Sequence, residues 1–174
     1  PDGSVLVANT GTQAQVYFYE SERVVELQSG EVFFDIQHDS QRPFIVQAGS
    51  SRVVVTGTRF NVLHEAQQLQ VSVESGSVNV TQGPWWSREQ RSLRAGQIVR
   101  NTPDHSLSAV QTADLSKELA WQRGMIVFEN TPLQQAISEI NRYLEQPALL
   151  NAPRLKDYRL AGVFSVEDPL ALIQ

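Results

Sequence analysis

Asp35, His38 and Asp39 form the group in this sequence that most resembles a catalytic site, because all three lie close together at the end of an apolar run. A carboxylate beside an imidazole could bind a metal ion or transfer a proton. In an extended chain, however, residues three apart project to opposite faces, so Asp35 and His38 cannot easily act on one atom. A solvated turn, in which Asp39 accepts an Asx-type hydrogen bond, explains the segment better.

The other residue types that carry chemistry do not form a site either. The sequence contains no Cys, which excludes disulfides, thiolate metal sites and cysteine nucleophiles. His64 and His105 stand in unlike contexts with no acidic motif around them, and no G-x-S-x-G or S-x-x-K pattern is present. TGTRFN, at residues 56–61, lacks the Gly-Lys-Ser/Thr ending of a phosphate loop. We therefore expect a non-enzymatic protein without a cofactor or metal, and a hydrolase with a dispersed site is the weakest hypothesis.

The charge and hydropathy of the chain narrow the choice of partner. Fourteen Lys and Arg stand against 19 Asp and Glu, a formal net charge of −5, which disfavours binding to nucleic acid. The chain has no apolar run long enough to span a membrane, and its first residues lack the features of a signal peptide. Because the sequence starts without Met and stops within a helical pattern, we expect it to be a piece of a longer protein.

Residues 1–100 have the pattern of a β-domain. Apolar and polar residues alternate along 69–74 and 77–80, which is typical of strands buried on one face. Short runs of similar composition, separated by Gly, Ser, Asp or Pro, predict further strands at 15–20, 24–27, 31–36, 43–48, 51–55 and 59–63. The fold class predicted is mainly β: a rolled, partly repetitive antiparallel or solenoid-like β-domain, followed by a small, truncated α/β domain.

Glycines mark the predicted corners of this β-domain. Gly30, Gly76 and Gly96 each follow a small residue between two predicted strands, where a positive φ or a sharp turn costs Gly least. In VVVTGTRFNV, at 53–62, Gly57 and Thr58 interrupt two strands, and we predict a β-corner with a positive φ at Gly57. Arg59, beside this corner, is expected to pair with a carboxylate or a backbone carbonyl.

A linker is predicted at 101–117 and a small α/β domain at 118–174. WQRGMIVFE (121–129) reads as a strand, and the helix after it has Thr131 as N-cap, Pro132 as its first residue and Gln134 as capping-box partner. The helical stripe contains Leu133, Ala136, Ile137, Ile140 and Leu144. YRLAGVF (158–164) predicts a second strand, and a second helix is expected to open with Ser165 and Asp168 as a possible capping box.

Two features suggest recognition of a partner. Trp85 and Trp86 are adjacent in a Gly-Pro loop, where one exposed ring could anchor an interface, although both could instead cap the β-core. The strand near the C-terminus could accept a partner strand at its free edge. Its candidate partner-binding residues are Leu160, Ala161, Gly162, Val163 and Phe164. A carbohydrate- or peptidoglycan-binding module that stacks sugars on the two Trp rings is the alternative function.

Several motifs together resemble the periplasmic domain of the FecR family of sigma-factor regulators. They are the opening DGSVLVANTGT, L-x-x-G-E-V-F-F at 27–34, PF-x-V at 43–46, GT-x-F-N-V at 57–62, E-S-G-x-V-x-V at 74–80, and LRAGQIV. FENTPLQQAISEINRY, with RLAGVFSVEDPLALI after it, resembles the short N-terminal domain of secretins and TonB-dependent receptors.

The resemblance implies the periplasmic part of a single-pass inner-membrane protein. In that scheme this part binds the periplasmic signalling domain of a TonB-dependent outer-membrane receptor that is loaded with a siderophore or a similar ligand. Regulated proteolysis then frees a sigma factor, which is held only by a cytoplasmic segment absent here. The resemblance implies protein partners and neither nucleic acid nor a direct small-molecule ligand.

Overall fold

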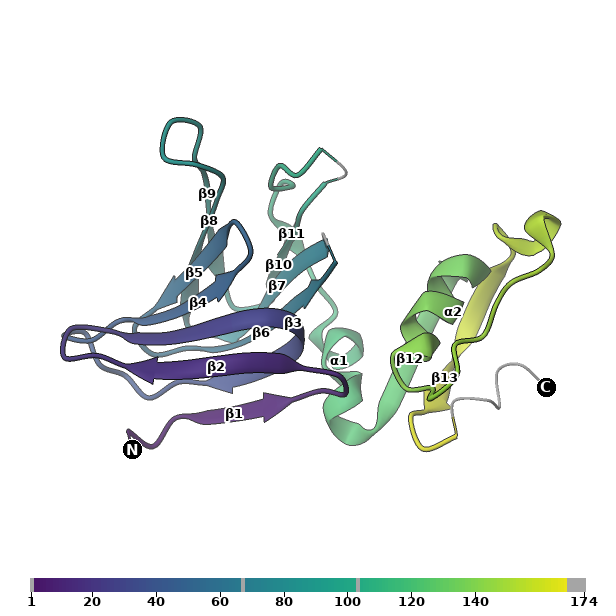
Figure 1. The fold of residues 1–174 in the computed structure, drawn as a ribbon, viewed down its shortest axis with the longest axis horizontal. Helices are drawn as coiled ribbons and strands as arrows, with labels where there is room; N and C mark the ends of the chain where they lie inside the picture. The colour runs from purple at the N-terminus through teal and green to yellow at the C-terminus, as the bar shows by residue number, and fades with distance from the viewer. Residues whose placement is uncertain (1, 67, 103, 169–174) are drawn as a thin grey trace. The chain divides into compact units, whose positions relative to one another are not determined.

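The computed structural model describes residues 2–66, 68–102 and 104–168, and the chain divides into two compact units, 1–115 and 116–174 (Figure 1). Strands dominate the first unit and the fold is mainly β, as predicted. The strands of the first unit are β1 (Val5–Ala8), β2 (Gln13–Phe18), β3 (Arg23–Asp35), β4 (Phe44–Ala48), β5 (Ser51–Val55), β6 (Arg59–Glu65), β7 (Gln68–Ser75), β8 (Ser77–Gln82), β9 (Glu89–Arg94), β10 (Gln97–Arg100) and β11 (Gln111–Thr112).

These strands form one sheet that rolls up. Its order is β11-β10-β7-β6-β3-β4-β5-β8-β9, and β1 and β2 each pair with β3 as well. Every neighbouring pair is antiparallel except β3 with β4. Because β9 at one end also lies close to β7 and β10, the sheet curls until its two arms face each other. The prediction of a rolled β-domain is therefore confirmed.

The long strand β3 belongs to both arms of the roll. Its first half pairs with β2 and β4, and its second half pairs with β1 and β6. A straight strand of this length would span roughly 40 Å, whereas the nine steps from Asp35 to Phe44 reach at most roughly 30 Å. Since Phe44 nevertheless pairs with Arg23, β3 must bend.

Gly30, which has a φ of +104°, lies at the middle of β3. A Cβ there would lie 2.5 Å from Thr12 Cα, so only Gly fits the crowded bend. The prediction of two separate strands at 24–27 and 31–36 is wrong, because β3 stays paired throughout. Strand β2 pairs with it as far as Ser29, and β6 pairs with it from Gly30 onward.

The corner between β5 and β6 exists, but its glycine has a different role from the one predicted. Gly57 does not have a positive φ. Instead, the backbone of His38 passes so close that a Cβ on Gly57 would lie 2.7 Å from His38 Cα. Thr58, which is buried, donates its hydroxyl to the Ser77 carbonyl over 2.9 Å and ties the corner to β8. The close approach of His38, and not a positive φ, therefore explains why residue 57 is a glycine.

The other two predicted turn glycines have the expected backbone. Gly76, between β7 and β8, has a φ of +85°, and Gly96, between β9 and β10, has a φ of +79°. Nothing lies within 4 Å of the position of a Cβ at Gly96, so only backbone conformation favours Gly there.

The core of the first unit fills the inside of the roll. Its largest members include Leu27, Phe34, Phe44, Phe60 and Leu93, all at most 1 % exposed. The pattern along 69–74 predicts burial on one face only. That prediction is wrong for β7, because Gln70 and Ser72 are buried too. The Gln70 side-chain oxygen accepts a hydrogen bond from Arg100 over 2.7 Å, which helps a polar residue to tolerate this position.

The first unit buries the charged side chain of Arg23 completely. Arg23, 0 % exposed, bonds Asp2 Oδ2 over 2.5 Å and the carbonyls of Arg42 and Gln37 over 3.0 and 3.2 Å. Its guanidinium also lies 5.6 Å from the centre of the Phe44 ring. Burial acts to raise the pKa of Asp2, but the hydrogen bonds from Arg23 and Ser4 and the charge of Arg23 outweigh it and lower that pKa to about 2.

The second unit is a small α/β structure. Strands β12 (Met125–Pro132) and β13 (Arg159–Ser165) pair antiparallel. Its helices are α1 (Leu115–Glu118), which crosses the unit boundary, the short η1 (Ala120–Arg123), α2 (Leu133–Asn141) and η2 (Pro153–Leu155). None of the described helices is long and apolar enough to cross a membrane.

Helix α2 begins differently from the prediction. Thr131 is part of β12, opposite Leu160, so Pro132 is the N-cap and no side chain caps the helix. Of the predicted apolar stripe, Ala136 and Ile140 are buried in the core of the unit, and Leu144 packs against that core although it lies beyond the end of the helix. Strand β12 starts later than residue 121, because η1 occupies 120–123 and Gly124 ends it with a φ of +70°.

The second predicted helix falls largely outside the described residues, since 169–174 are not among them. Ser165 is the last residue of β13, and its hydroxyl oxygen accepts a hydrogen bond from the Glu167 backbone N–H over 3.1 Å.

Candidate protein interface

The sheet of the second unit has one covered face and one open face. On the covered face, Phe128, Leu160 and Phe164 pack with Ala136 and Ile140 of α2. On the other face, Val163 is 62 % exposed and Ala161 is exposed beside it. Because successive residues of a strand alternate between faces, β13 divides its five candidate partner-binding residues between the two.

Of those five residues, only Ala161 and Val163 are available to a partner through their side chains. Leu160 and Phe164 belong to the core of the unit. Gly162 lies between them, and a Cβ there would lie 3.0 Å from the Phe164 ring, so the glycine allows that ring to fold back across the strand.

The edges of this sheet are also unpaired. Among the described residues, β12 and β13 pair only with each other, so each has one edge of N–H and C=O groups with no neighbouring strand. Such an edge can accept a strand from another chain. The pairing is regular from Met125 to Phe128, opposite Ser165 to Gly162, and shifts between Phe128 and Thr131.

Trp85 and Trp86 lie at the tip between β8 and β9, away from the core. They are 80 % and 71 % exposed, so the possibility that they cap the β-core is wrong. Their ring centres are 5.7 Å apart and the ring planes meet at 88°. A turn in which the Ser87 N–H donates to the Pro84 carbonyl over 3.0 Å closes the tip.

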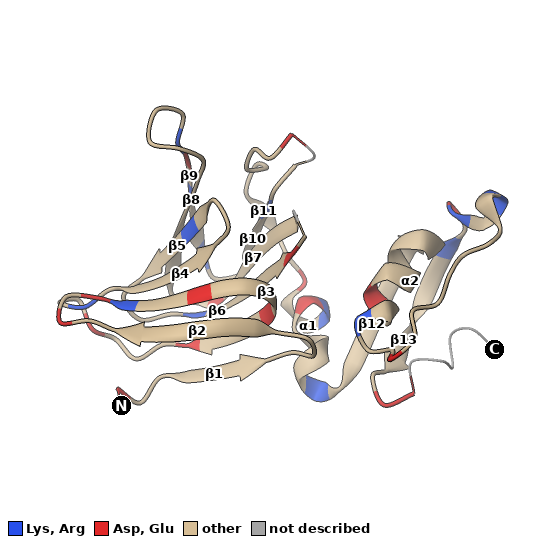
Figure 2. Ribbon diagram, viewed as in Figure 1, with Lys and Arg blue, Asp and Glu red and all other residues tan. Residues whose placement is uncertain are grey.

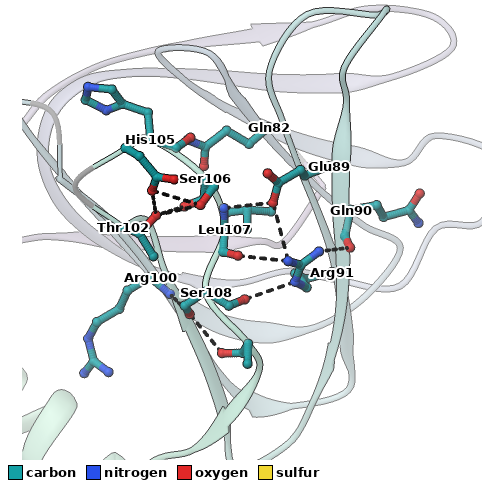
Figure 3. A network of polar contacts seen from close by, with 12 residues as sticks. Gln82, Glu89, Gln90, Arg91, Arg100, Thr102, His105, Ser106, Leu107 and Ser108 are labelled. Carbon is teal, nitrogen blue, oxygen red and sulfur yellow. Dashed lines mark hydrogen bonds and ion pairs between the residues drawn. The ribbon is translucent and has the colours of Figure 1, made fainter.

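The segment predicted as a linker packs on the first unit over much of its length. Residues Asn101 and Leu107 form a β-bridge, β11 follows, and Leu107 is only 3 % exposed. Arg91 of β9 donates to the Leu107 and Ser108 carbonyls over 2.9 and 3.0 Å, and Glu89 accepts from the Leu107 N–H over 3.0 Å (Figure 3).

A second group of hydrogen bonds closes the same segment. The Gln82 amide donates to the His105 carbonyl, and Thr102 bonds Asp104 and Ser106 (Figure 3). Hydrogen bonds from Thr102 and Ser106 lower the pKa of Asp104. Together, the two groups of hydrogen bonds tie residues 105, 107 and 108 to β8 and β9.

The residues first considered for catalysis serve structural roles in the described parts of the chain. Asp39 accepts from the Gln41 and Arg42 N–H groups over 3.0 and 3.1 Å, the predicted Asx-type turn, and its hydrogen bond from the Arg42 side chain lowers its pKa. Arg59 pairs with Glu74 at 2.6 Å and with Asp35 at 3.8 Å, as expected of an arginine at a corner.

No metal site is found among the described residues. No three His, Asp or Glu side chains in 2–66, 68–102 and 104–168 gather closely enough to hold an ion. His64 and His105 line a shallow hollow of about 240 Å³ together with Gly49, Ser50, Ser51, Gln82, Asn101 and others. His64 Nδ1 donates to the Leu27 carbonyl over 3.1 Å, which fixes the ring to β3.

One exposed apolar region was not singled out from the sequence as a binding candidate. Along β2 and the residue after it, Val16, Phe18 and Tyr19 are 48 %, 45 % and 52 % exposed. The signal was available in QAQVYFY, which is an uncharged strand with no Pro or Gly.

Comparisons with known proteins found a matching family model and similar solved structures. A family model described as "FecR protein" matches residues 1–79. Two crystal structures of a "putative anti-sigma factor from Parabacteroides distasonis ATCC 8503" are similar to the whole chain. At 1.65 Å resolution the TM-score is 0.84 with 28 % identity, and at 2.50 Å it is 0.83 with 29 % identity. Each alignment covers 100 % of this chain and 83 % of the other.

No curated protein matches the sequence. The family match lies within the β-unit that carries the FecR-like motifs, and the structural similarity extends over the second unit as well. On these two findings, residues 1–79 match the FecR family and the whole chain is similar in structure to a protein described as an anti-sigma factor, which together support a FecR-family sigma-factor regulator.

Proposed function

We propose that this chain is the periplasmic signalling part of a membrane-anchored anti-sigma factor, and that it binds the signalling domain of a TonB-dependent outer-membrane receptor. The match of residues 1–79 to the FecR family and the similarity to an anti-sigma factor support a regulator that works through protein partners. In this proposal, receptor occupancy by a siderophore or a similar ligand is passed to the inner membrane and then to transcription.

The open side of the β12–β13 sheet is the observation that carries the receptor contact. It combines an unpaired strand edge with the exposed side chains of Ala161 and Val163, and Val127 lies directly opposite Val163. A partner strand could hydrogen-bond to the edge, while its side chains cover these small apolar residues. The contact would be of modest area, which suits a transient signalling complex.

Charged residues should contribute only a small part of the binding free energy of this contact. Acidic and basic residues are interspersed along the elements of both units, with no long stretch of one sign (Figure 2). Backbone pairing and apolar burial therefore supply most of the binding free energy in this proposal, and the salt dependence of the affinity should be weak.

Titration calorimetry of the 174-residue chain against the periplasmic signalling domain of a receptor encoded beside its gene tests the proposal. Val163→Lys places a charge on the open face, where its side chain is solvated in the free protein, and should weaken binding at least tenfold. Val5→Lys, at a site in the first unit that is 54 % exposed, is the matched control and should leave the affinity unchanged. Unaltered binding by Val163→Lys would refute the assignment of the contact to this face.

Sugar binding at Trp85 and Trp86 is the alternative, and the exposure of both rings favours it. Their planes are perpendicular, however, so only one ring at a time can offer a flat stacking surface. A glycan array that includes peptidoglycan fragments separates the two functions. Binding that the double variant Trp85→Ala, Trp86→Ala abolishes would support the alternative.

A further inference from the structure

Strand β2 has a free outer edge and stands mostly in solvent. Among the described residues it pairs only with β3, and five of its six residues are exposed. Val16 and Phe18 lie on the same face as their buried partners Val25 and Arg23 in β3. The core-facing side of the sheet therefore continues past the core and leaves apolar side chains uncovered at β2.

This edge lacks the devices that usually prevent strands from pairing between molecules. From Gln13 to Tyr19 the sequence has no charge, Pro or Gly, and the ribbon of β2 carries no blue or red in Figure 2. The other outer strands offer less to a partner: β9 contains Glu89, Arg91 and Arg94, β11 is only two residues long, and β1, although uncharged, has only four residues. The difference marks β2 as an edge suited to a partner strand.

The hydrogen-bond pattern of the hairpin determines which backbone groups of β2 are free. The Tyr19 N–H donates to the Glu22 carbonyl over 2.9 Å, so these two residues form a hydrogen-bonded pair. Such pairs alternate along antiparallel strands, so Tyr17 and Gln15 also bond toward β3. The N–H and C=O groups of the even-numbered residues, Ala14, Val16 and Phe18, therefore point outward.

We propose that β2 pairs with β2 of a second copy of this chain, antiparallel and centred on Val16. A two-fold axis at Val16 places Val16 opposite its own copy and Ala14 opposite Phe18. All three outward residues then face outward residues, which yields about six hydrogen bonds. If the two-fold axis moved to Gln15 or to Tyr17, only about four hydrogen bonds would form between the two β2 strands. The register centred on Val16 therefore makes the most hydrogen bonds.

The side chains complement each other in the same register. On the apolar face, small Ala14 meets large Phe18 and the two Val16 side chains meet at the axis. On the other face, Gln15 lies opposite Tyr17, and these two side chains already hydrogen-bond within one chain over 2.5 Å. Glu20, the nearest acidic residue along the chain, would lie opposite Thr12, so no two like charges face each other.

A second copy fits this edge better than a strand of another protein because the edge is complementary to itself in hydrogen bonds, in side-chain size and in charge. The dimer would join two β3–β2 hairpins into one continuous sheet. It uses the first unit, and so it is independent of the proposed receptor contact on the second.

Sedimentation velocity of the full chain over a concentration series tests the pairing. We expect a concentration-dependent dimer, and Val16→Lys, which places two positive charges at the axis, should weaken self-association at least tenfold. Val16→Asp should weaken it similarly, whereas a mixture of the two variants should form the dimer again. Recovery in the mixture shows that both variants fold.

Val7→Lys is the matched control. Val7 is 40 % exposed on β1, which is also an apolar strand paired only with β3 among the described residues. This substitution should leave self-association unchanged. A chain that remains monomeric at every concentration, or a dimer that Val16→Lys does not weaken, would overturn the proposal.

A cysteine substitution tests the register. The chain contains no Cys, so Val16→Cys introduces a single thiol. Opposed residues of a hydrogen-bonded pair have Cα atoms about 5.5 Å apart, within the range that a disulfide spans. Under mild oxidation Val16→Cys should form covalent dimers much faster than Val7→Cys, and equal rates would contradict pairing at Val16.

Discussion

Removing the negative charge of Asp2 should destabilise the first unit strongly, although Asp2 stands almost at the start of the chain. Its carboxylate is the charged partner of Arg23, whose side chain is 0 % exposed, while the side chain of Asp2 itself is 10 % exposed. Asp2→Asn keeps the shape of the side chain and an acceptor for the Ser4 N–H, but it leaves the guanidinium with two carbonyls and no counter-charge.

Two estimates of the cost agree. The pKa of Asp2 falls from 3.8 to about 2, a difference of roughly 1.8, and at about 1.36 kcal/mol for each pKa unit this corresponds to about 2.4 kcal/mol. Breaking a buried ion pair from one side typically costs about 3–5 kcal/mol, and the two remaining carbonyl acceptors reduce that figure here. We expect a loss of about 2–3 kcal/mol.

Urea unfolding followed by circular dichroism, at pH 7 and at intervals down to pH 2, measures this loss. Since the pKa of Asp2 is lower in the folded than in the unfolded state, its contribution is complete above pH 4 and is lost as the pH falls from about 4 to about 2. The free energies of unfolding of the wild type and Asp2→Asn should therefore differ at pH 7 and converge near pH 2.

Asp39→Asn is the matched control, because Asp39 also pairs with an arginine, but Arg42 is 42 % exposed. Its effect should be much smaller, since exposed ion pairs contribute little. A difference below about 0.5 kcal/mol between the wild type and Asp2→Asn at pH 7, or a gap that persists unchanged at pH 2, would refute this account of the buried arginine.

Three further substitutions test separate parts of the fold by the same unfolding measurement. Gly57→Val should cost about 1–3 kcal/mol because its Cβ would collide with the His38 backbone, and a neutral result would contradict the close approach. Leu107→Ala should cost about 2–4 kcal/mol if the segment after β10 is part of the core, whereas a true linker would tolerate the change. Ile140→Ala should destabilise the second unit by about 2–5 kcal/mol, and amide hydrogen exchange should show the β-core of the first unit unaffected.

The strands and the class of fold could be predicted because they follow from local alternation and from turn residues. The strand from 59 and the one from 51 are both present, and the break between them is a real corner. The predictions that failed concern features that depend on residues far away in the sequence. Gly57 is a glycine because His38 lies against it, and no pattern within 53–62 indicates that. Gly30 looks like a turn when read locally, but pairing with β1, β2, β4 and β6 keeps both sides of it in one strand.

The candidate interface was predictable in place but not in detail. An edge strand was expected at 158–164 and is found at 159–165, yet the sequence does not indicate which of its residues the helix covers, because that depends on how α2 packs. Thr131 illustrates the same limit: its type and spacing suit an N-cap, but pairing with β13 requires it in the strand. Residues 101–117 were predicted to be a linker because their composition is mostly polar. That composition does not indicate that Leu107 is buried and holds the segment to the first unit.

The shared strand β3 makes the first unit a single cooperative body. A sandwich of two separate sheets can lose one layer at a time, whereas here the layers have a common member, and unravelling either one exposes Leu27 or Phe34 of that member. Slow amide exchange should therefore report one opening free energy for both arms. Partial unfolding, where it occurs, should be limited to β1, β2 and the tip with Trp85 and Trp86, which the roll does not require for closure.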